Sequence, residues 1–179
     1  MEGRPLRARA RPGRRRFLSV VAVISDTHLP RGTRALPDAC VRLLRGSDLI
    51  LHAGDFVSAA FFEELQALGP PVEAVHGNMA EPELKASLSR ERVVEVGAVR
   101  IGMLHDAGAR VGREARLAAR FPGCGAMVYG HSHVPQVERF EELWVLNPGS
   151  PTDRRRQPTH TMLVLRIRGA RISPELVAL

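Results

Sequence analysis

Two histidines stand two residues apart in the segment VYGHSHVP (128–135), and their types and spacing could do metal chemistry. The pair follows a short apolar run of the kind that forms a buried strand. A lone pair of this kind is more often structural than metal-binding, because neutral histidine is readily accommodated at half-buried positions. Whether His131 and His133 bind a metal therefore depends on the rest of the chain.

Other apolar runs of the chain also end in a turn that carries an oxygen or imidazole ligand. These ligands are Asp26, His28, Asp55, Asn78 and His105. In open α/β sheets, ligands bind beyond the carboxyl ends of the strands, so we expect these side chains to converge. Residues at i and i+2 of an extended segment project to the same side, which would let each closely spaced pair aim at one point.

The resulting set comprises two carboxylates, one carboxamide and four imidazoles, without a thiolate. Seven ligands exceed what one ion takes from a protein while keeping water positions, so two divalent ions that share a carboxylate fit better. Such donors suit Mn, Fe, Ni, Co or Zn and do not choose among them. Manganese is our first expectation. Two metals about 3.5 to 4 Å apart clamp the attacking and leaving oxygens of an in-line phosphoryl displacement. The pattern therefore predicts phosphoester hydrolysis.

The ordered motifs DTH, HAGD, HGN, LHD, GHSH and NPGS, over residues 20–168, resemble the calcineurin-like metallophosphoesterase superfamily, especially its small single-domain bacterial and archaeal phosphodiesterases. The resemblance implies a four-layer α/β/β/α sandwich with a dinuclear site between the sheet edges. It assigns the first metal to Asp26, His28, Asp55 and His133. It assigns the second to Asp55, Asn78, His105 and His131, with Asp55 bridging. A hydroxide bridging the ions would attack phosphorus in line.

The resemblance and the strand-end positions also suggest roles for individual residues. The predicted catalytic residues are Asp55, Asn78 and His105. Residues that would lie behind the ligands are Asp106, His52, His76 and Asn147. A structural role is favoured for the two histidines of that group. For Asp106 a turn role and a hydrogen bond to a ligand imidazole are equally favoured, and Asn147 matches a loop near the site.

Met79 departs from the superfamily pattern, which commonly has a histidine after the asparagine of GN. A thioether cannot protonate a leaving oxygen, so this role is vacant or is filled by another group. We therefore expect the enzyme to favour good leaving groups, such as those of aryl phosphodiesters.

Most of the positive charge lies at the N-terminus. The 179 residues carry a formal charge of +7, and the first sixteen residues hold seven arginines and one acid, Glu2. We expect residues 1–18 to form a disordered, solvated arm, with polyanion binding or a misassigned translation start as alternatives. The nearly neutral residues 19–179 are predicted to form a single metallophosphoesterase domain.

The first half of the chain alternates between predicted strands and helices. Strands are predicted over 17–25, 48–55 and 72–78, and helices over 36–46 and 59–69. Short strands that alternate with helices favour a largely parallel sheet.

The second half is predicted to be mostly antiparallel. It contains a hairpin over 92–106 that turns near Gly97, a helical stretch over 110–121, and several later strands joined by short turns. The predicted fold class is therefore α/β (α+β), with two mixed sheets flanked by helices in a four-layer α/β/β/α sandwich.

The sequence offers no apolar run long enough to span a membrane, and no small-residue cleavage site follows the apolar residues 17–25. Cys40 and Cys124 lack the spacing of a disulfide framework. We therefore expect a reduced, cytoplasmic protein.

A small phosphodiester is the expected substrate, and no membrane partner is expected. Nucleic acid is less favoured, since the nucleases of this superfamily are larger and carry capping domains; the basic arm is the feature that would support it. The resemblance suggests a homodimer or homotetramer. The alternative to an enzyme is a non-catalytic metal-binding scaffold, because the retromer subunit of the same fold serves protein assembly.

Overall fold

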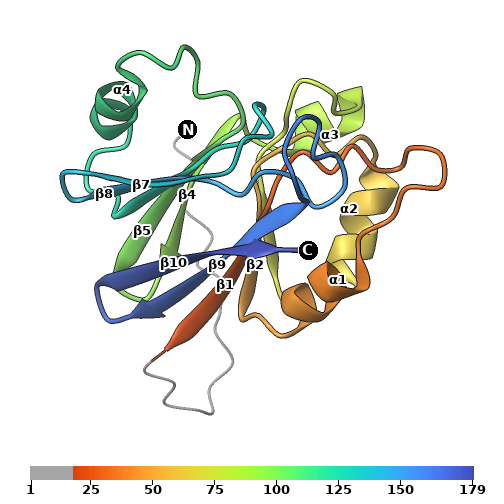
Figure 1. The fold of residues 1–179 in the computed structure, drawn as a ribbon, viewed down its shortest axis with the longest axis horizontal. Helices are drawn as coiled ribbons and strands as arrows, with labels where there is room; N and C mark the ends of the chain where they lie inside the picture. The colour runs from red at the N-terminus through yellow and green to blue at the C-terminus, as the bar shows by residue number, and fades with distance from the viewer. Residues whose placement is uncertain (1–17) are drawn as a thin grey trace.

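The computed structural model describes residues 18–179, which form two five-stranded sheets and four helices (Figure 1). The helices lie outside the two sheets, with α1 to α3 beside one sheet and α4 beside the other. The predicted arm, residues 1–18, falls outside the described residues except for Leu18.

The first sheet has the order β10-β9-β1-β2-β3. Its parallel part consists of β1 (Ser19–Ile24), β2 (Leu49–His52) and β3 (Val72–Ala74). Helix α1 (Asp38–Arg45) joins β1 to β2, and α2 (Ala59–Gln66) joins β2 to β3. The alternation of strands and helices predicted for this half is confirmed, and the three strands end at one edge of the sheet because they run in parallel.

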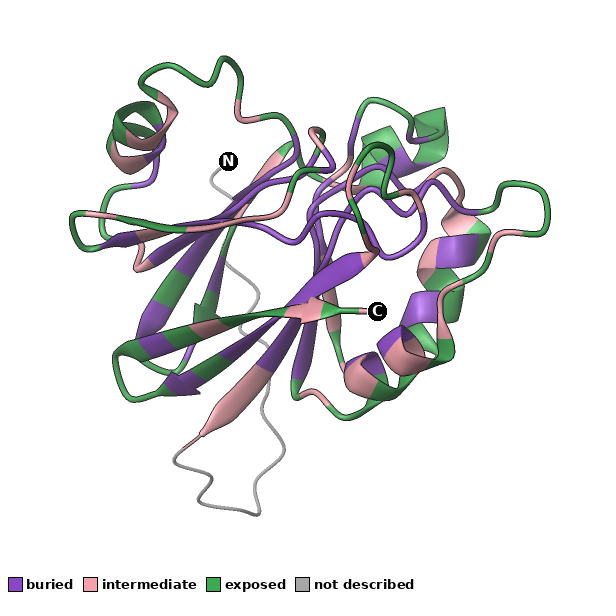
Figure 2. Ribbon diagram, viewed as in Figure 1, coloured by how far each residue is buried: buried purple, intermediate pink, exposed green. Residues whose placement is uncertain are grey.

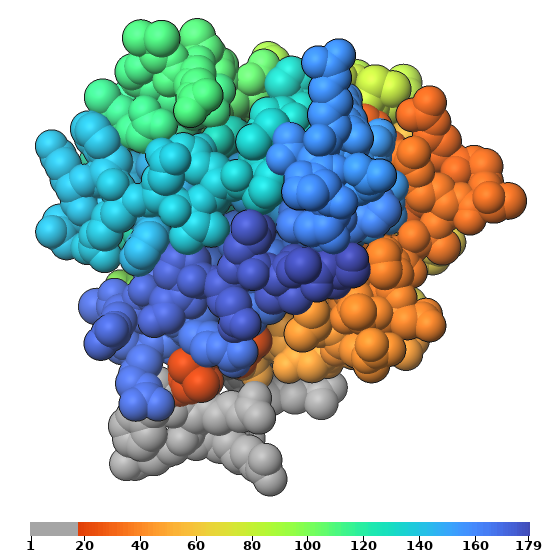
Figure 3. Space-filling model, viewed as in Figure 1, coloured from red at the N-terminus to blue at the C-terminus, as the bar shows by residue number. Residues whose placement is uncertain are grey.

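A C-terminal hairpin completes the first sheet. It consists of β9 (Thr161–Arg168) and β10 (Arg171–Ala178), and β9 pairs antiparallel with β1. In the space-filling view, the blue surface of this hairpin lies between the cyan surface of the second sheet and the orange surface around α1 (Figure 3). The edge strand β10 also contacts β7 of the second sheet, so the hairpin covers this side of the sandwich.

The second sheet has the order β4-β5-β6-β8-β7. Its strands are β4 (Glu91–Val96), β5 (Val99–Leu104), β6 (Ala126–Val128), β7 (Gln136–Phe140) and β8 (Leu143–Asn147). The hairpin predicted over 92–106 is confirmed. The prediction of mostly antiparallel pairing is correct for the two hairpins of this sheet, β4–β5 and β7–β8. It is wrong for the centre of the sheet, where β6 is parallel to both β5 and β8.

Two further helices complete the outer layers, α3 beside the first sheet and α4 beside the second. Helix α4 (Arg113–Arg120) lies within the predicted helical stretch 110–121. Helix α3 (Pro82–Ser87) was not predicted, since it is a short helix that begins at a proline and buries only Leu84. Proline at the first helical position is compatible with its fixed φ and its missing N–H group.

Alternate side chains of the central strands enter different hydrophobic layers. In β1, Val21 and Val23 lie between the two sheets, whereas Ala22 faces α1 and α2. On the outer face of the second sheet, Met127 of β6 and Leu117 of α4 belong to one hydrophobic cluster. Figure 2 shows the resulting pattern, with buried strands at the centre and exposed residues on the outer faces of the helices. The predicted four-layer α/β/β/α fold is therefore confirmed.

None of the helices in residues 18–179 combines the length and the apolar character needed to cross a membrane.

Candidate metal centre

The seven predicted ligands lie in loops just beyond the ends of five strands. Those that follow the first sheet are Asp26 and His28 after β1, Asp55 after β2, and Asn78 after β3. Those that follow the second sheet are His105 after β5, and His131 and His133 after β6. The sandwich places these two sets of loops against each other, so that residues far apart in the sequence meet.

Six of the seven form two groups, and within each group the ligand atoms all lie within 4.8 Å of one another. The first group consists of Asp26, His28 and His133, and the second of Asp55, His105 and His131. Each group takes residues from both sheets. Carboxylate oxygens and imidazole nitrogens at such separations can coordinate a divalent ion.

Five of these ligands have a left-handed backbone. The φ angles of Asp26, His28, Asp55, His131 and His133 lie between 49° and 66°. Such values are uncommon outside glycine and concentrate at functional sites. The extended geometry expected for the two closely spaced pairs is therefore wrong: turns, and not strands, orient these side chains.

In the first group, two imidazole nitrogens face each other. His28 Nε2 lies 3.1 Å from His133 Nε2, and the two rings stack with centroids 5.1 Å apart. Burial lowers the pKa of both histidines, which favours their neutral forms. The Nδ1–H of His133 donates to the carbonyl of Asp153, which leaves the lone pair of its Nε2 directed into the site.

Asp26 supplies a buried carboxylate to the same group. Its Oδ1 lies 3.4 Å from His133 Nε2 and accepts the backbone N–H of His131, and its Oδ2 accepts the hydroxyl of Ser25 at 2.6 Å. Burial raises the pKa of Asp26 to about 7, in spite of these hydrogen bonds. A bound cation would supply the charge compensation that this buried carboxylate lacks.

The second group is built around His105. Its Nδ1–H donates to the carbonyl of Ala53 at 2.8 Å, and its Nε2 lies 3.2 Å from Asp55 Oδ2. That Nε2 is buried without a well-formed hydrogen bond among the described residues. The ring of His131 meets His105 edge-to-face, with centroids 5.2 Å apart, and is exposed, so this group opens to solvent.

Asp55 lies between the two groups. Its Oδ2 is 3.2 Å from His105 Nε2 and 4.0 Å from His28 Nε2, while its Oδ1 accepts the backbone N–H of Met79. Burial works against ionisation of Asp55, but its 3.2 Å contact with His105 Nε2 and the hydrogen bond from the backbone N–H of Met79 hold its pKa at about 2. An ionised carboxylate in this position can serve both groups.

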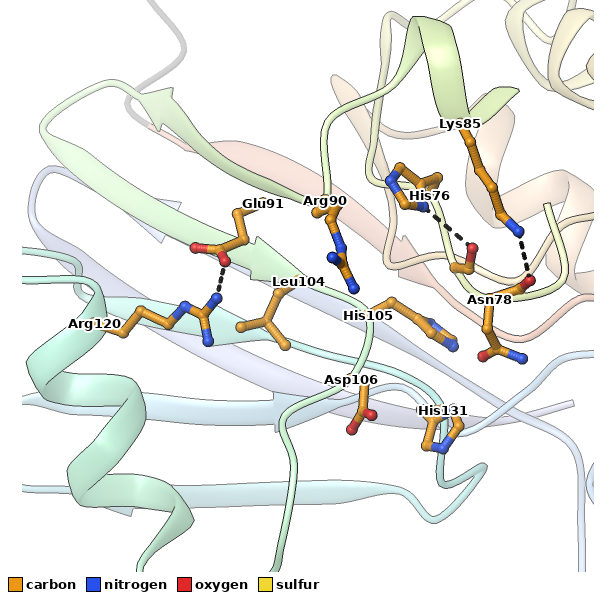
Figure 4. Close-up of a pocket in the computed structure, with 11 residues that line it drawn as sticks. His76, Asn78, Lys85, Arg90, Glu91, Leu104, His105, Asp106, Arg120 and His131 are labelled. Carbon is orange, nitrogen blue, oxygen red and sulfur yellow. Dashed lines mark hydrogen bonds and ion pairs between the residues drawn. The ribbon is translucent and has the colours of Figure 1, made fainter. Parts of the chain in front are cut away.

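A cavity of about 760 Å³ adjoins the second group (Figure 4). Its lining includes His76, Asn78, Lys85, Arg90, Glu91, His105, Asp106, Arg120 and His131. The side chain of Asn78 lies on the same side of the cavity as the rings of His105 and His131. The exposed Asn78 thus lies beside the second group. The next residue, Met79, is 51% exposed.

His52 connects the two ligand loops of the first sheet. Its Nδ1 accepts the backbone N–H of Gly54 at 3.2 Å, and its Nε2 is 3.1 Å from the hydroxyl of Thr27. Burial lowers the pKa of His52 to about 3, so the ring is neutral. His52 therefore holds the loops of Asp26 and Asp55 together without reaching a metal position itself.

The other three residues expected behind the ligands differ in their contacts. Buried Asn147 donates to the carbonyl of Gly130 and to the hydroxyl of Ser132, so it braces the loop of His131 and His133. His76 bonds the carbonyl of Gly77 through Nδ1 and lines the cavity. Asp106 accepts the backbone N–H of Gly108, a turn interaction.

Sequence reasoning missed the residues that support the ligands through short hydrogen bonds. Ser25 bonds Asp26 directly, and buried Ser150 donates to the carbonyl of Asp26 and accepts the N–H of Asp153. Asp153 in turn accepts from His133 through its backbone carbonyl. Serine and a backbone carbonyl carry no distinctive sequence signal, although NPGS marked the loop that contains Ser150.

Comparison with known proteins gives a family match over most of the chain. Residues 20–170 match the model of the calcineurin-like phosphoesterase superfamily domain. A probable metallophosphoesterase of Methanothermobacter thermautotrophicus is 36% identical over 160 residues, which are 88% of this chain and 91% of that protein. A phosphodiesterase of Methanocaldococcus jannaschii is 24% identical over 142 residues, 72% of this chain and 82% of that protein.

Solved structures share the fold. Vacuolar protein sorting 29 from Cryptosporidium parvum superposes with a TM-score of 0.78 at 24% identity, over 92% of this chain and 93% of that chain.

Proposed function

The chain belongs to the calcineurin-like phosphoesterase superfamily, and from this premise we propose that it is a dinuclear metal-dependent phosphodiesterase. The observation that carries the proposal is the position of Asp55, whose Oδ2 lies 3.2 Å from His105 Nε2 and 4.0 Å from His28 Nε2. A carboxylate between two groups of ligands is the arrangement that a pair of ions sharing one ligand requires. The proposed substrate is a small phosphodiester, and the proposed location is the cytoplasm.

The donor atoms fit divalent ions. Asp26, His28, Asp55 and His133 would hold one ion, and Asp55, Asn78, His105 and His131 would hold the other. The ions would supply charge neutralisation at phosphorus and an acidified water as nucleophile. Nitrogen and oxygen donors without sulfur suit Mn, which we favour, and also Fe, Ni, Co or Zn.

The residues of the chain orient these groups and admit the substrate. Asp55, ionised at neutral pH, is fixed by the backbone N–H of Met79, and His105 is fixed by the carbonyl of Ala53. The cavity beside Asn78 and His105 gives the substrate access to the exposed second group. Preorganised groups of this kind stabilise a transition state without reorganising during the reaction.

The exposed side chain of Met79 supports a preference for good leaving groups. Methionine has no proton to donate to the departing oxygen, so an ester whose leaving group is stable as an anion would react fastest. Aryl phosphodiesters meet this requirement, which makes bis(p-nitrophenyl) phosphate the appropriate test substrate.

Hydrolysis of bis(p-nitrophenyl) phosphate with added Mn²⁺ tests the proposal. We expect turnover by the wild type, loss of turnover in EDTA, and a fall to the EDTA level in Asp55→Ala, because the shared ligand is removed. Asp38→Ala, an exposed carboxylate in the first turn of α1, is the matched control and should retain activity.

Absence of turnover with each of Mn²⁺, Fe²⁺, Ni²⁺, Co²⁺ and Zn²⁺ would contradict the proposed enzymatic activity and favour the alternative of a non-catalytic metal-binding scaffold.

A nuclease assisted by the arm would instead lose activity on DNA when residues 1–18 are deleted. Size-exclusion chromatography with light scattering would test the proposed homodimer or homotetramer.

A further inference from the structure

The wall of the cavity beside the second ligand group is basic. Lys85, Arg90 and Arg120 line the cavity, together with Glu91 (Figure 4). Arg120 forms an ion pair with Glu91, so these two charges neutralise each other. Lys85 donates to the neutral backbone carbonyl of Asn78 at 3.0 Å and forms no ion pair within residues 18–179. The wall therefore carries a net positive charge from Lys85 and Arg90.

The backbone places Arg90 close to the ligand His105. Glu91, the first residue of β4, pairs with Leu104, the last residue of β5. Continuation of this antiparallel register puts Arg90 opposite His105. The backbone N–H of His76 also donates to the carbonyl of Ser89, which ties the segment before Arg90 to the residues after β3.

The guanidinium of Arg90 is free to bind a ligand. Figure 4 shows it extending from the start of β4 toward the imidazole of His105. Within residues 18–179, the side chain of Arg90 takes part in no hydrogen bond or ion pair, whereas Arg120, which also lines the cavity, is paired. An unpaired arginine that points into a cavity presents several N–H donors in the planar arrangement that matches a phosphate.

We propose that Arg90, assisted by Lys85, forms an anion subsite that binds a second phosphate of the substrate, beside the scissile one. This inference rests on the proposed phosphodiesterase function and specifies its substrate class: phosphodiesters in which one esterified group carries a phosphate monoester of its own. The carboxylate of Asp106 lines the cavity on the other side of His105 from Arg90 and would repel such a group (Figure 4). The second phosphate therefore lies on the side of Arg90.

Two substrates that differ only in this second phosphate test the subsite. They are thymidine 5′-(p-nitrophenyl phosphate) and its 3′-phosphorylated derivative, and the measured quantity is the ratio of their kcat/KM values with Mn²⁺. We expect the wild type to favour the 3′-phosphorylated substrate, and Arg90→Gln to lower the ratio about tenfold or more, as for loss of a charged hydrogen bond. Arg90→Lys, which keeps the charge without the planar guanidinium, should give an intermediate ratio.

Arg45→Gln is the matched control, because Arg45 is an exposed arginine at the end of α1, on the outer side of the first sheet. It should leave both the ratio and the activity unchanged. A wild-type ratio near one, or an Arg90→Gln ratio equal to that of the wild type, would overturn the subsite.

A binding measurement separates failure of the subsite from failure of the proposed function. Isothermal titration calorimetry of the Mn²⁺-loaded full-length protein would compare thymidine 3′,5′-bisphosphate with thymidine 5′-monophosphate. Tighter binding of the bisphosphate that depends on Arg90 supports the subsite even if no diester is hydrolysed. Equal affinities overturn it even if bis(p-nitrophenyl) phosphate is a substrate.

Discussion

The buried position of Asp26 suits a metal ligand but lowers the stability of the metal-free folded protein. Asp26 is completely buried, and its hydrogen bonds come from neutral groups, the hydroxyl of Ser25 and the backbone N–H of His131. A favourable charge interaction with His105 offsets the effect of burial only in part. Burial raises the pKa of Asp26 to about 7 from 3.8. Between about pH 4 and pH 7, Asp26 in the metal-free folded state therefore keeps a proton that it has already lost in the unfolded state. The free energy of unfolding of the wild type falls as the pH rises through this range.

Replacement of Asp26 by asparagine should therefore stabilise the metal-free protein. The amide can accept from the N–H of His131 and donate to Ser25, whose hydroxyl can then donate to the carbonyl of Ala53. In EDTA, we expect Asp26→Asn to unfold at higher urea concentrations than the wild type, by on the order of 2–4 kcal/mol at pH 8. The difference should grow from about pH 4 to pH 7 and stay constant above. A variant less stable than the wild type at pH 8 would contradict this account.

The candidate ligand residues could be chosen from the sequence because metal chemistry restricts residue types. Aspartate, asparagine and histidine after apolar runs left few alternatives, and the structure brings Asp26 and His133 together across 107 residues of chain. The backbone could not be predicted in the same way. Left-handed φ angles at residues such as His28 depend on tertiary hydrogen bonds, including that from the N–H of His28 to the carbonyl of Asp55.

At the scale of elements, glycines let the ligand loops approach one another closely. A Cβ atom at Gly77 would overlap the carboxylate and the backbone nitrogen of Asp55. A Cβ atom at Gly130 would overlap the hydroxyl of Ser25 and approach the carboxylate of Asp26. Neither glycine has a positive φ, so the requirement is space and not the left-handed backbone.

Alanine at Gly77 should therefore displace Asp55 and impair both ligand groups. We expect Gly77→Ala to weaken Mn²⁺ binding about tenfold or more, as judged by calorimetric titration, because a ligand shared by both groups moves. Gly125→Ala is the matched control: Gly125 also lacks a positive φ, and its Cβ would meet the end of the flexible Ile172 side chain at 3.2 Å and Val99 at an ordinary contact distance of 3.7 Å. Equal Mn²⁺ affinities of the two variants would show that Asp55 accommodates the change.

The elements themselves were predictable to different degrees. The strand over 17–25 and the helix over 59–69 have long apolar patterns, and the structure contains β1 and α2 within them. Helix α3 and strand β6 are short, with six and three residues, and their positions depend on neighbouring elements. The parallel pairing of β6 with β5 and β8 is a tertiary property, because three buried residues fit parallel and antiparallel neighbours equally well.

At the scale of the whole molecule, each ligand group joins the two sheets. His133 comes from the second sheet and meets Asp26 and His28 from the first, while Asp55 comes from the first sheet and meets His105 of the second. Without metal, these contacts are imidazole and carboxylate pairs, among them the facing Nε2 atoms of His28 and His133. An ion bound to either group would hold the sheets together in the folded state only, because the unfolded chain does not gather these ligands.

Metal binding should therefore raise the melting temperature in two separable steps. At about 100 times its dissociation constant, one ion contributes about 2.7 kcal/mol, which for a chain of this size is an increase of roughly 5–10 °C. His133→Ala removes a ligand of the first group and leaves Asp55, His105 and His131 in place. Differential scanning calorimetry with Mn²⁺ and with EDTA should then give about half the wild-type increase for His133→Ala. The increase, and not the absolute melting temperature, is compared because loss of a buried imidazole lowers stability with or without metal. An increase equal to that of the wild type would mean that the first group takes no ion, and the dinuclear proposal would then fail while a single site around Asp55 remained.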